Sequence, residues 1–131
     1  MTKGSCEDMS IVRAADAPRF ELNGAQFTVY AGPSHGSKEI CTWRLTVPGG
    51  SQSIPHTLDR DEVFVVLSGA IRITPDGEVL TGGDSAVVPA GERIELGNPS
   101  DEPAEVQVAL KAGVTAYHMD GSLFGTPPWA A

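Results

Sequence analysis

The sequence has few basic residues. Its 131 residues include 9 Lys and Arg against 17 Asp and Glu, so the formal net charge at pH 7 is -8. A surface with this charge repels the phosphate backbone of nucleic acids, which proteins bind through clusters of Lys and Arg. We therefore expect no nucleic-acid partner, and we interpret the acidic excess as a feature that favours solubility.

Long hydrophobic segments are also absent. The longest strongly apolar run spans residues 63–67, whereas a membrane-spanning helix needs about 20 predominantly apolar residues. Residues 1–10 contain no apolar core of the kind that a secretory signal requires. We therefore expect neither a membrane span nor export, and the predicted location is cytoplasmic.

Cysteine is scarce, and no segment has a sustained helical period. The two cysteines are Cys6, in a polar segment, and Cys41, beside Trp43 in a strand-like segment. This placement does not indicate a disulfide framework. We interpret Cys41 as a core residue.

Glycine and proline, in contrast, are abundant. The 15 Gly and 10 Pro separate short runs that are rich in Val, Ile, Thr and aromatic residues, a pattern typical of an all-β domain with a barrel or sandwich architecture. Asn23-Gly24 predicts a tight turn between strands at residues 20–22 and 26–30. The further strands that we predict span residues 39–47, 62–67, 70–74, 85–88, 93–96 and 104–111.

The domain organisation follows from this pattern. We expect residues 19–119 to form one compact domain, because the chain is too short for two ordinary ones. A polar lead-in of residues 1–18 precedes the domain, and an extended tail of residues 120–131 follows it, with Trp129 as the residue that fixes the tail to the domain.

Two motifs of fixed spacing occupy the centre of the chain. The first reads Gly50, five residues, His56, one residue, Leu58, three residues, Glu62, six residues, Gly69. The second reads Gly83, five residues, Pro89, one residue, Gly91, two residues, Ile94, three residues, Asn98. Together they resemble the two signature motifs of the cupin superfamily, over about residues 39–110. The resemblance implies an all-β fold, the cupin double-stranded β-helix or jelly-roll barrel.

The resemblance also implies a metal site. In cupins, two histidines and a glutamate of the first motif join a histidine of the second to hold a divalent metal. The matching positions are His56, Leu58, Glu62 and Ile94. Leucine and isoleucine have no lone pair, so His56 and Glu62 alone would hold a metal weakly. The chain therefore resembles a single-domain cupin with degenerate metal-binding motifs; we expect no cofactor, and a bound divalent metal stays an alternative.

His118 and His35 are the two histidines that could complete a metal site. If the strand that begins at residue 104 keeps its register, His118 points inward, but a bulge at Gly113 would reverse its direction. A surface or strand-end position is therefore the stronger interpretation of His118. His35 lies in a Gly/Pro/Ser loop, where we expect exposure to solvent, with a place at the pocket rim as the alternative.

Strand alternation predicts the lining of the barrel. With Glu62 pointing inward, Phe64 and Val66 also point inward, and so do Ile71 and Ile73 if their apolar face is the interior one. Core packing is the alternative role for each aliphatic residue. A mostly apolar pocket with one polar pair suits a small, largely apolar ligand. The predicted lining residues are Tyr30, Cys41, Trp43, Leu58, Phe64, Val66 and Ile94.

Three functional hypotheses follow for His56 and Glu62. The first is a metal-independent enzyme of small-molecule or specialised metabolism that uses the pair for proton transfer, as an isomerase, dehydratase or cyclase. The second is a non-catalytic module that binds a small molecule. The third is a metal-dependent dioxygenase or cyclase with a rebuilt ligand set. An inert, hydrogen-bonded polar pair is the structural alternative to all three. We also expect a homodimer, formed by sheet extension through residues 20–30.

Overall fold

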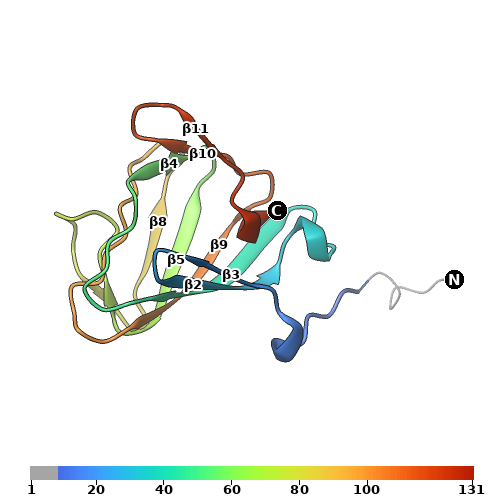
Figure 1. Ribbon diagram of the computed structural model, residues 1–131, viewed down its shortest axis with the longest axis horizontal. Helices are drawn as coiled ribbons and strands as arrows, with labels where there is room; N and C mark the ends of the chain where they lie inside the picture. The colour runs from blue at the N-terminus through green and yellow to red at the C-terminus, as the bar shows by residue number, and fades with distance from the viewer. Residues whose placement is uncertain (1–8) are drawn as a thin grey trace, which may run out of the picture.

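The structure is a computed structural model that describes residues 9–131, and these residues form an antiparallel all-β fold, as predicted (Figure 1). The largest sheet has six strands in the order β1-β2-β3-β9-β5-β8, and two smaller sheets have the orders β11-β10-β4 and β6-β7. The strands are β1 (Arg19–Leu22), β2 (Ala25–Ala31), β3 (Ile40–Val47), β4 (His56–Leu58), β5 (Glu62–Ser68), β6 (Ala70–Ile71), β7 (Leu80–Thr81), β8 (Ser85–Val88), β9 (Ala104–Lys111), β10 (Ala116–His118) and β11 (Leu123–Gly125).

Three short 3-10 helices, η1 (Ala14–Asp16), η2 (Pro33–His35) and η3 (Pro128–Ala130), complete the elements of residues 9–131. No helix in this range is long and apolar enough to cross a membrane. Residues 1–8, which include Cys6 and part of the predicted lead-in, lie outside the described part of the chain.

The central strands of the large sheet follow the predicted alternation. In β3, every second residue from Cys41 to Val47 is buried, and the residues between them are partly exposed. β9 pairs with β3 on one side and with β5 on the other, so Trp43, Val108 and Phe64 lie in one row across three strands. These inward residues form the core because their apolar side chains share one face of the sheet.

The hairpin between β1 and β2 turns at Asn23 and Gly24, as the dipeptide predicts. Their φ angles are 51° and 87°, and a two-residue hairpin turn of this kind requires positive φ at both positions. The turn places Leu22 and Asn23 at the edge of the barrel interior, where both contribute to the lining of a cavity.

Two predicted strands differ from the structure. The strand at residues 70–74 is reduced to β6, and residues 93–96 form no strand. Instead, Ile94 makes an isolated bridge to His56, and Gly97 makes isolated bridges to Gln52 and Arg72. Because this segment changes partner within a few residues, it pairs with its neighbours without forming a continuous ladder.

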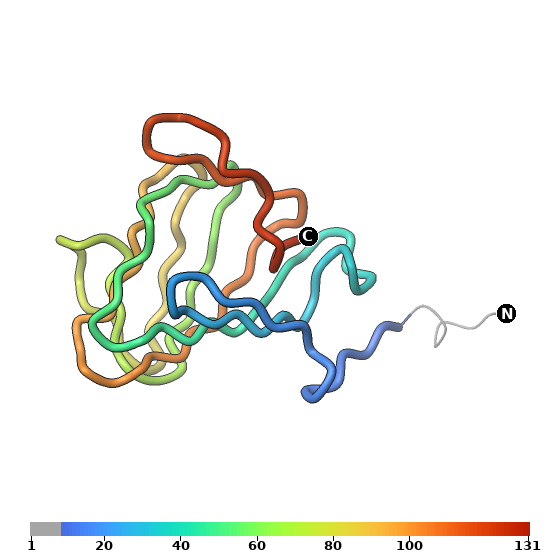
Figure 2. The backbone as a smooth tube through the Cα atoms, in the orientation of Figure 1, coloured from blue at the N-terminus to red at the C-terminus, as the bar shows by residue number. Residues whose placement is uncertain are grey.

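The C-terminal segment packs more closely on the barrel than an extended tail would. β11 pairs with β10, and the ring of Trp129 in η3 stacks on Phe27 with centroids 3.8 Å apart and an angle of 10° between the planes. The Ser34 side chain donates a hydrogen bond to the carbonyl oxygen of Ala131. Figure 2 shows this segment, in red, beside the cyan segment that contains η2. Trp129 thus fixes the tail to the barrel.

Candidate functional site

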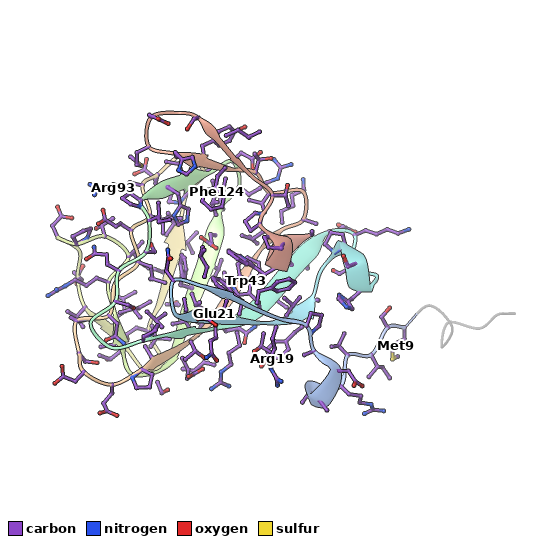
Figure 3. All side chains as sticks on the ribbon, viewed as in Figure 1. Met9, Arg19, Glu21, Trp43, Arg93 and Phe124 are labelled. Atoms are coloured by element: carbon purple, nitrogen blue, oxygen red, sulfur yellow. The ribbon has the colours of Figure 1, made fainter. Side chains whose placement is uncertain are left out.

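A cavity of about 130 Å³ lies inside the barrel, between the large sheet and the sheet of β4, β10 and β11. Its walls are mostly apolar, and the side chains around it, including Trp43 and Phe124, are drawn in Figure 3. The volume is similar to that of the ~150 Å³ apolar cavities that bind a benzene ring. The site is therefore of a size for a small organic molecule.

Six of the predicted catalytic and lining residues border this cavity. They are Trp43, His56, Leu58, Glu62, Phe64 and Ile94. They come from β3, β4, β5 and the segment that pairs with β4, so residues distant in the sequence converge in the barrel.

Three predicted lining residues do not border the cavity. Tyr30 is 39% exposed and lies on the outer face, because Phe27 and Val29 of the same strand take the inward positions. Val66 points inward but is enclosed in the core, where it pairs with Val106. Both placements correct the expectation from sequence.

Cys41 is the third of these residues, and it is fully buried in the core. Its Sγ donates a hydrogen bond to the carbonyl oxygen of Ala130, at 3.5 Å. Burial raises the pKa of the Cys41 thiol. The thiol therefore resembles a small apolar side chain more than a nucleophile.

Glu62 is the first residue of β5 and points into the cavity. It is only 6% exposed, and its strand neighbours on the two sides are Leu110 and Val88. Its carboxyl group has no hydrogen-bond partner within the described part of the chain. Burial raises the pKa of Glu62 to about 8 because the charged form loses its hydration. At neutral pH the side chain is thus mainly a carboxylic acid with one O–H donor.

His56 is the first residue of β4, and its backbone is held by Ile94. The His56 N–H donates to the Ile94 carbonyl at 2.9 Å, and the Ile94 N–H donates to the His56 carbonyl at 2.8 Å. The ring Nδ1 lies 2.8 Å from the carbonyl oxygen of Ile54. Because a carbonyl only accepts, Nδ1 carries the hydrogen, and Nε2 of the neutral ring keeps a free lone pair.

The two side chains come from different sheets and are not bonded to each other. No hydrogen bond joins His56 and Glu62 in the structure. The alternative of an inert pair, in which the two side chains bond to each other, is therefore not supported. The cavity instead contains a separate hydrogen-bond donor and a separate base. This arrangement can exchange protons with a ligand placed between them.

The other polar side chains of the lining mostly have partners in the protein. Ser51 donates to the Pro48 carbonyl, Gln52 donates to Glu95, and Ser53 accepts from the Leu96 N–H. The Nε1 of Trp43 is buried with no partner in residues 9–131. The polar capacity left for a ligand is therefore small.

Neither of the remaining histidines borders the cavity. The alternation of buried residues in β9 continues beyond Gly113, since Val114 and Ala116 are buried. His118 lies in β10, where it pairs with His56 of β4. The His118 ring packs on Phe124, with centroids 5.0 Å apart. His35 is the last residue of η2, in the loop before β3. The alternative of His35 at the pocket rim is therefore wrong.

The residues present do not fit the divalent metal that the cupin motifs imply. Leu58 and Ile94 occupy two of the four ligand positions, and both are buried apolar side chains. Within residues 9–131, no group of three or more His, Cys, Asp or Glu side chains is arranged to hold a metal ion. A donor set of His56 and Glu62 alone does not fix an ion.

The aromatic residues of the lining are the part of the site that sequence patterns mostly missed. Phe27, Phe124 and Trp129 border the cavity together with Trp43 and Phe64. Inward parity in the predicted strand at residues 26–30 is a signal for Phe27. No local pattern identifies Phe124, because its role depends on how the tail folds back.

The family assignment comes from a family model described as "Cupin domain", which matches residues 43–111. This range covers more than half of the chain and includes both motifs. The chain is a cupin. Its motifs keep the spacing of the family, with Leu58 and Ile94 at two of the metal positions. A search among curated proteins finds no significant match.

Three solved structures with the same fold are of proteins whose name or activity is known. The polyketide cyclase RemF from Streptomyces resistomycificus has a TM-score of 0.69 at 16% identity, and the match covers 79% of each chain. A sugar phosphate isomerase from Silicibacter pomeroyi has a TM-score of 0.63 at 25% identity, covering 76% of this chain and 68% of that one. KdgF from Halomonas has a TM-score of 0.61 at 16% identity, covering 79% and 92%. These likenesses support the jelly-roll fold of this cupin.

Proposed function

We propose that this cupin is a metal-independent enzyme of small-molecule metabolism that catalyses proton transfer, as an isomerase, dehydratase or cyclase, with His56 as base and Glu62 as acid. The observation that carries the proposal is the presence of two unpaired, complementary groups in one apolar cavity. Nε2 of the neutral His56 ring has a lone pair to accept a proton, and the Glu62 carboxyl group borders the same cavity with burial as the one cause of its raised pKa.

The proposed step uses only these two side chains. His56 Nε2 takes a proton from a carbon next to a carbonyl group, and the electrons of the C–H bond form a carbon–carbon double bond. The carbonyl π electrons move to oxygen, which takes the proton of Glu62. The product is a neutral enol, with an imidazolium at His56 and a carboxylate at Glu62. Return of a proton to a different carbon completes an isomerisation, and the enol can instead attack an electrophile in a cyclisation.

The apolar walls support this step. They keep water away from Glu62, so the ion pair formed by His56 and Glu62 attracts more strongly than it would in water. They also favour the protonated form of Glu62 before the reaction. The same environment therefore prepares the acid and stabilises the charges that its reaction creates.

The experiment that tests this proposal measures exchange of carbon-bound hydrogen for deuterium, by NMR, across a panel of carbonyl compounds. We expect the wild type to accelerate exchange and both His56→Ala and Glu62→Gln to lose about 100-fold or more of this rate. His35→Ala is the matched control, because His35 lies away from the cavity. An exchange rate unchanged in His56→Ala would refute the proposal.

A non-catalytic binding module is the second candidate, and the predominance of apolar walls favours it. This alternative requires a ligand that binds the wild type without reacting. It also requires His56→Ala and Glu62→Gln to retain that binding. Calorimetry with the two variants, combined with product analysis for the wild type, separates it from the enzyme hypothesis.

A metal-dependent enzyme is the third candidate, and it would need ligands beyond His56 and Glu62. Elemental analysis of protein purified without chelator tests it directly. We expect no stoichiometric iron, nickel, copper, manganese or zinc. One equivalent of any of these metals, lost in His56→Ala, would favour the metal-dependent alternative.

For the assembly, we propose a homodimer formed along β1. This strand is the edge of the six-stranded sheet, so its outer backbone groups are available to pair with a second copy. Light scattering should give twice the 13.7 kDa mass of one chain. Arg19→Pro would be expected to weaken the dimer by removing a backbone donor at the edge, and a monomeric wild type would refute the proposal.

A further inference from the structure

The aromatic residues of this chain are concentrated around one cavity. Only 6% of the residues are aromatic, and of the eight Phe, Trp and Tyr side chains, five border the cavity. Phe27 and Trp129 form a stacked pair in its wall. Flat rings prefer to pack against aromatic faces in stacked or tilted arrangements. The walls are thus suited to a flat ligand.

Charge limits the ligand further. Within the described part of the chain, no Lys or Arg borders the cavity. The carboxyl group of Glu62, which burial keeps mainly protonated at neutral pH, offers a hydrogen bond but no positive charge. A phosphate or carboxylate placed in this cavity would lose its hydration with no Lys or Arg to compensate, and it would face the lone pair of the neutral His56 ring. The cavity therefore selects against anionic ligands.

The hydrogen-bond capacity of the cavity also selects against ligands with many hydroxyl groups. Ser51, Gln52 and Ser53 already have protein partners, which leaves Glu62, His56 and the Nε1 donor of Trp43 for a ligand. A sugar-like ligand would bury several hydroxyl groups without partners, at a cost of about 1–3 kcal/mol each. A ligand with a single polar end matches the site better.

The mouth of the cavity has the same apolar character. Three lining residues, Leu22, Ile54 and Phe124, are 37%, 41% and 37% exposed, so they mark where the cavity meets solvent. They come from β1, the segment before β4, and β11. Exposed apolar side chains at a cavity mouth favour the passage of an apolar molecule.

We infer that the substrate of this cupin is an uncharged, flat cyclic ketone with an enolisable carbon, bound with its rings against Phe27 and Trp129 and its carbonyl oxygen toward Glu62. This inference rests on the function proposed above. A ketone provides the two features that the polar groups require, an acceptor oxygen for the Glu62 O–H and an acidic C–H for His56 Nε2.

The test compares three ligands of similar size with the wild-type protein. β-Tetralone is a flat uncharged ketone, β-naphthoate is a flat anion, and β-decalone is an uncharged ketone without an aromatic ring. Quenching of the fluorescence of Trp43 and Trp129, which both border the cavity, reports binding. We expect β-tetralone to bind about tenfold or more tightly than each of the other two ligands, a difference of ~1.4 kcal/mol.

Two variants show whether the aromatic wall causes the preference. Trp129→Leu should remove most of the advantage of β-tetralone over β-decalone, with Trp43 fluorescence as the signal. Tyr30→Leu is the matched control, because Tyr30 lies on the outer face, and it should leave the preference unchanged. Circular dichroism melts show whether each variant folds. A folded Trp129→Leu variant with the full preference would overturn the inference.

Deuterium exchange into β-tetralone separates this inference from the proposed function. Preferred binding of β-tetralone without accelerated exchange would support the ligand class and contradict the acid–base function. Accelerated exchange together with equal or tighter binding of β-naphthoate or β-decalone would support the function and overturn the ligand class. Failure of β-tetralone to bind the folded wild type would also overturn the ligand class.

Discussion

At the scale of single residues, the environment of Glu62 determines its protonation state. A charged carboxylate at this position would lose its hydration and gain no partner, since the neighbouring walls are apolar and neither Lys nor Arg of residues 9–131 borders the cavity. The neutral acid has no such cost. Folding therefore favours the protonated form of Glu62, and ionisation of the carboxyl group lowers the stability of the fold.

The raised pKa of Glu62 makes stability dependent on pH. In the unfolded chain the pKa is near 4.5, and in the folded protein burial raises it to about 8. Between these values the folded state binds one more proton than the unfolded state, so the free energy of unfolding falls as pH rises, by about 1.4 kcal/mol per pH unit at most.

We predict that Glu62→Gln removes this contribution, because glutamine imitates the neutral acid and does not titrate. Urea unfolding of the wild type and the variant across roughly pH 5 to 8 gives the comparison. The difference in unfolding free energy should shift in favour of the variant as pH rises. A difference that is constant with pH would contradict the raised pKa.

The sequence allowed His56 and Glu62 to be predicted through the motif spacing, and the structure gives the geometry that spacing does not contain. The tautomer of the His56 ring depends on the carbonyl of Ile54, a backbone group present at every position. Tyr30 and Cys41 were placed in the lining from their strand-like context. The parity that points Phe27 inward places Tyr30 on the outer face, whereas the burial of Cys41 against Ala130 depends on how the tail folds back.

At the scale of elements, one motif glycine is required by close packing. Gly69, after β5, has φ of +81°, and a Cβ there would lie 2.7 Å from the Cα of Ala104. Gly83 has φ of +93°, and a Cβ at that position would meet no atom within 4 Å. The two glycines share a left-handed backbone and differ in available space.

This difference predicts unequal effects of the same substitution. Gly83→Ala should cost about 1–2 kcal/mol, the conformational cost of a left-handed alanine. Gly69→Ala adds overpacking of about 1–3 kcal/mol against the start of β9. Thermal or urea unfolding of the two variants measures the difference. Equal destabilisation would show that backbone conformation alone governs both positions.

Strand prediction succeeded where one face of a strand is buried along its length. The alternation of β3 and β9 is visible in the sequence because their inward residues contact the same core. Residues 93–96 were predicted as a strand, but this segment pairs with its neighbours by isolated bridges. In the tail, only β11 forms a ladder, with β10. Beyond it, Trp129 contacts the barrel through a ring stack and Ala130 through a hydrogen bond, and neither contact requires an alternating sequence.

At the scale of the whole molecule, the barrel brings residues that range in the sequence from Leu22 to Trp129 together around one cavity. Its apolar character depends in part on Leu58 and Ile94, which stand at two metal positions of the cupin motifs. The motif spacing predicted the fold and the polar pair. It could not predict the aromatic wall, because Phe124 and Trp129 reach the cavity only after the chain has closed the barrel.

If Leu58 and Ile94 alone prevent metal binding, replacing both should restore it. We predict that the variant with both Leu58→His and Ile94→His binds one Ni²⁺ or Mn²⁺, as measured by calorimetry. At a metal concentration 100-fold above Kd, its free energy of unfolding should rise by about 3 kcal/mol. Leu58→Ala combined with Ile94→Ala is the matched control and should show neither effect. A double-histidine variant that folds and binds no metal would show that the backbone of the site has also diverged.

The central claim is that the cavity contains a protonated Glu62 as its acid, and NMR titration of the Glu62 side-chain carboxyl carbon tests it most directly. Glu62→Gln identifies the signal by its loss. A midpoint near 8 is the predicted result, since burial raises the pKa to about that value. A midpoint near the ordinary 4.5 would show that the group is charged at neutral pH and would contradict the account.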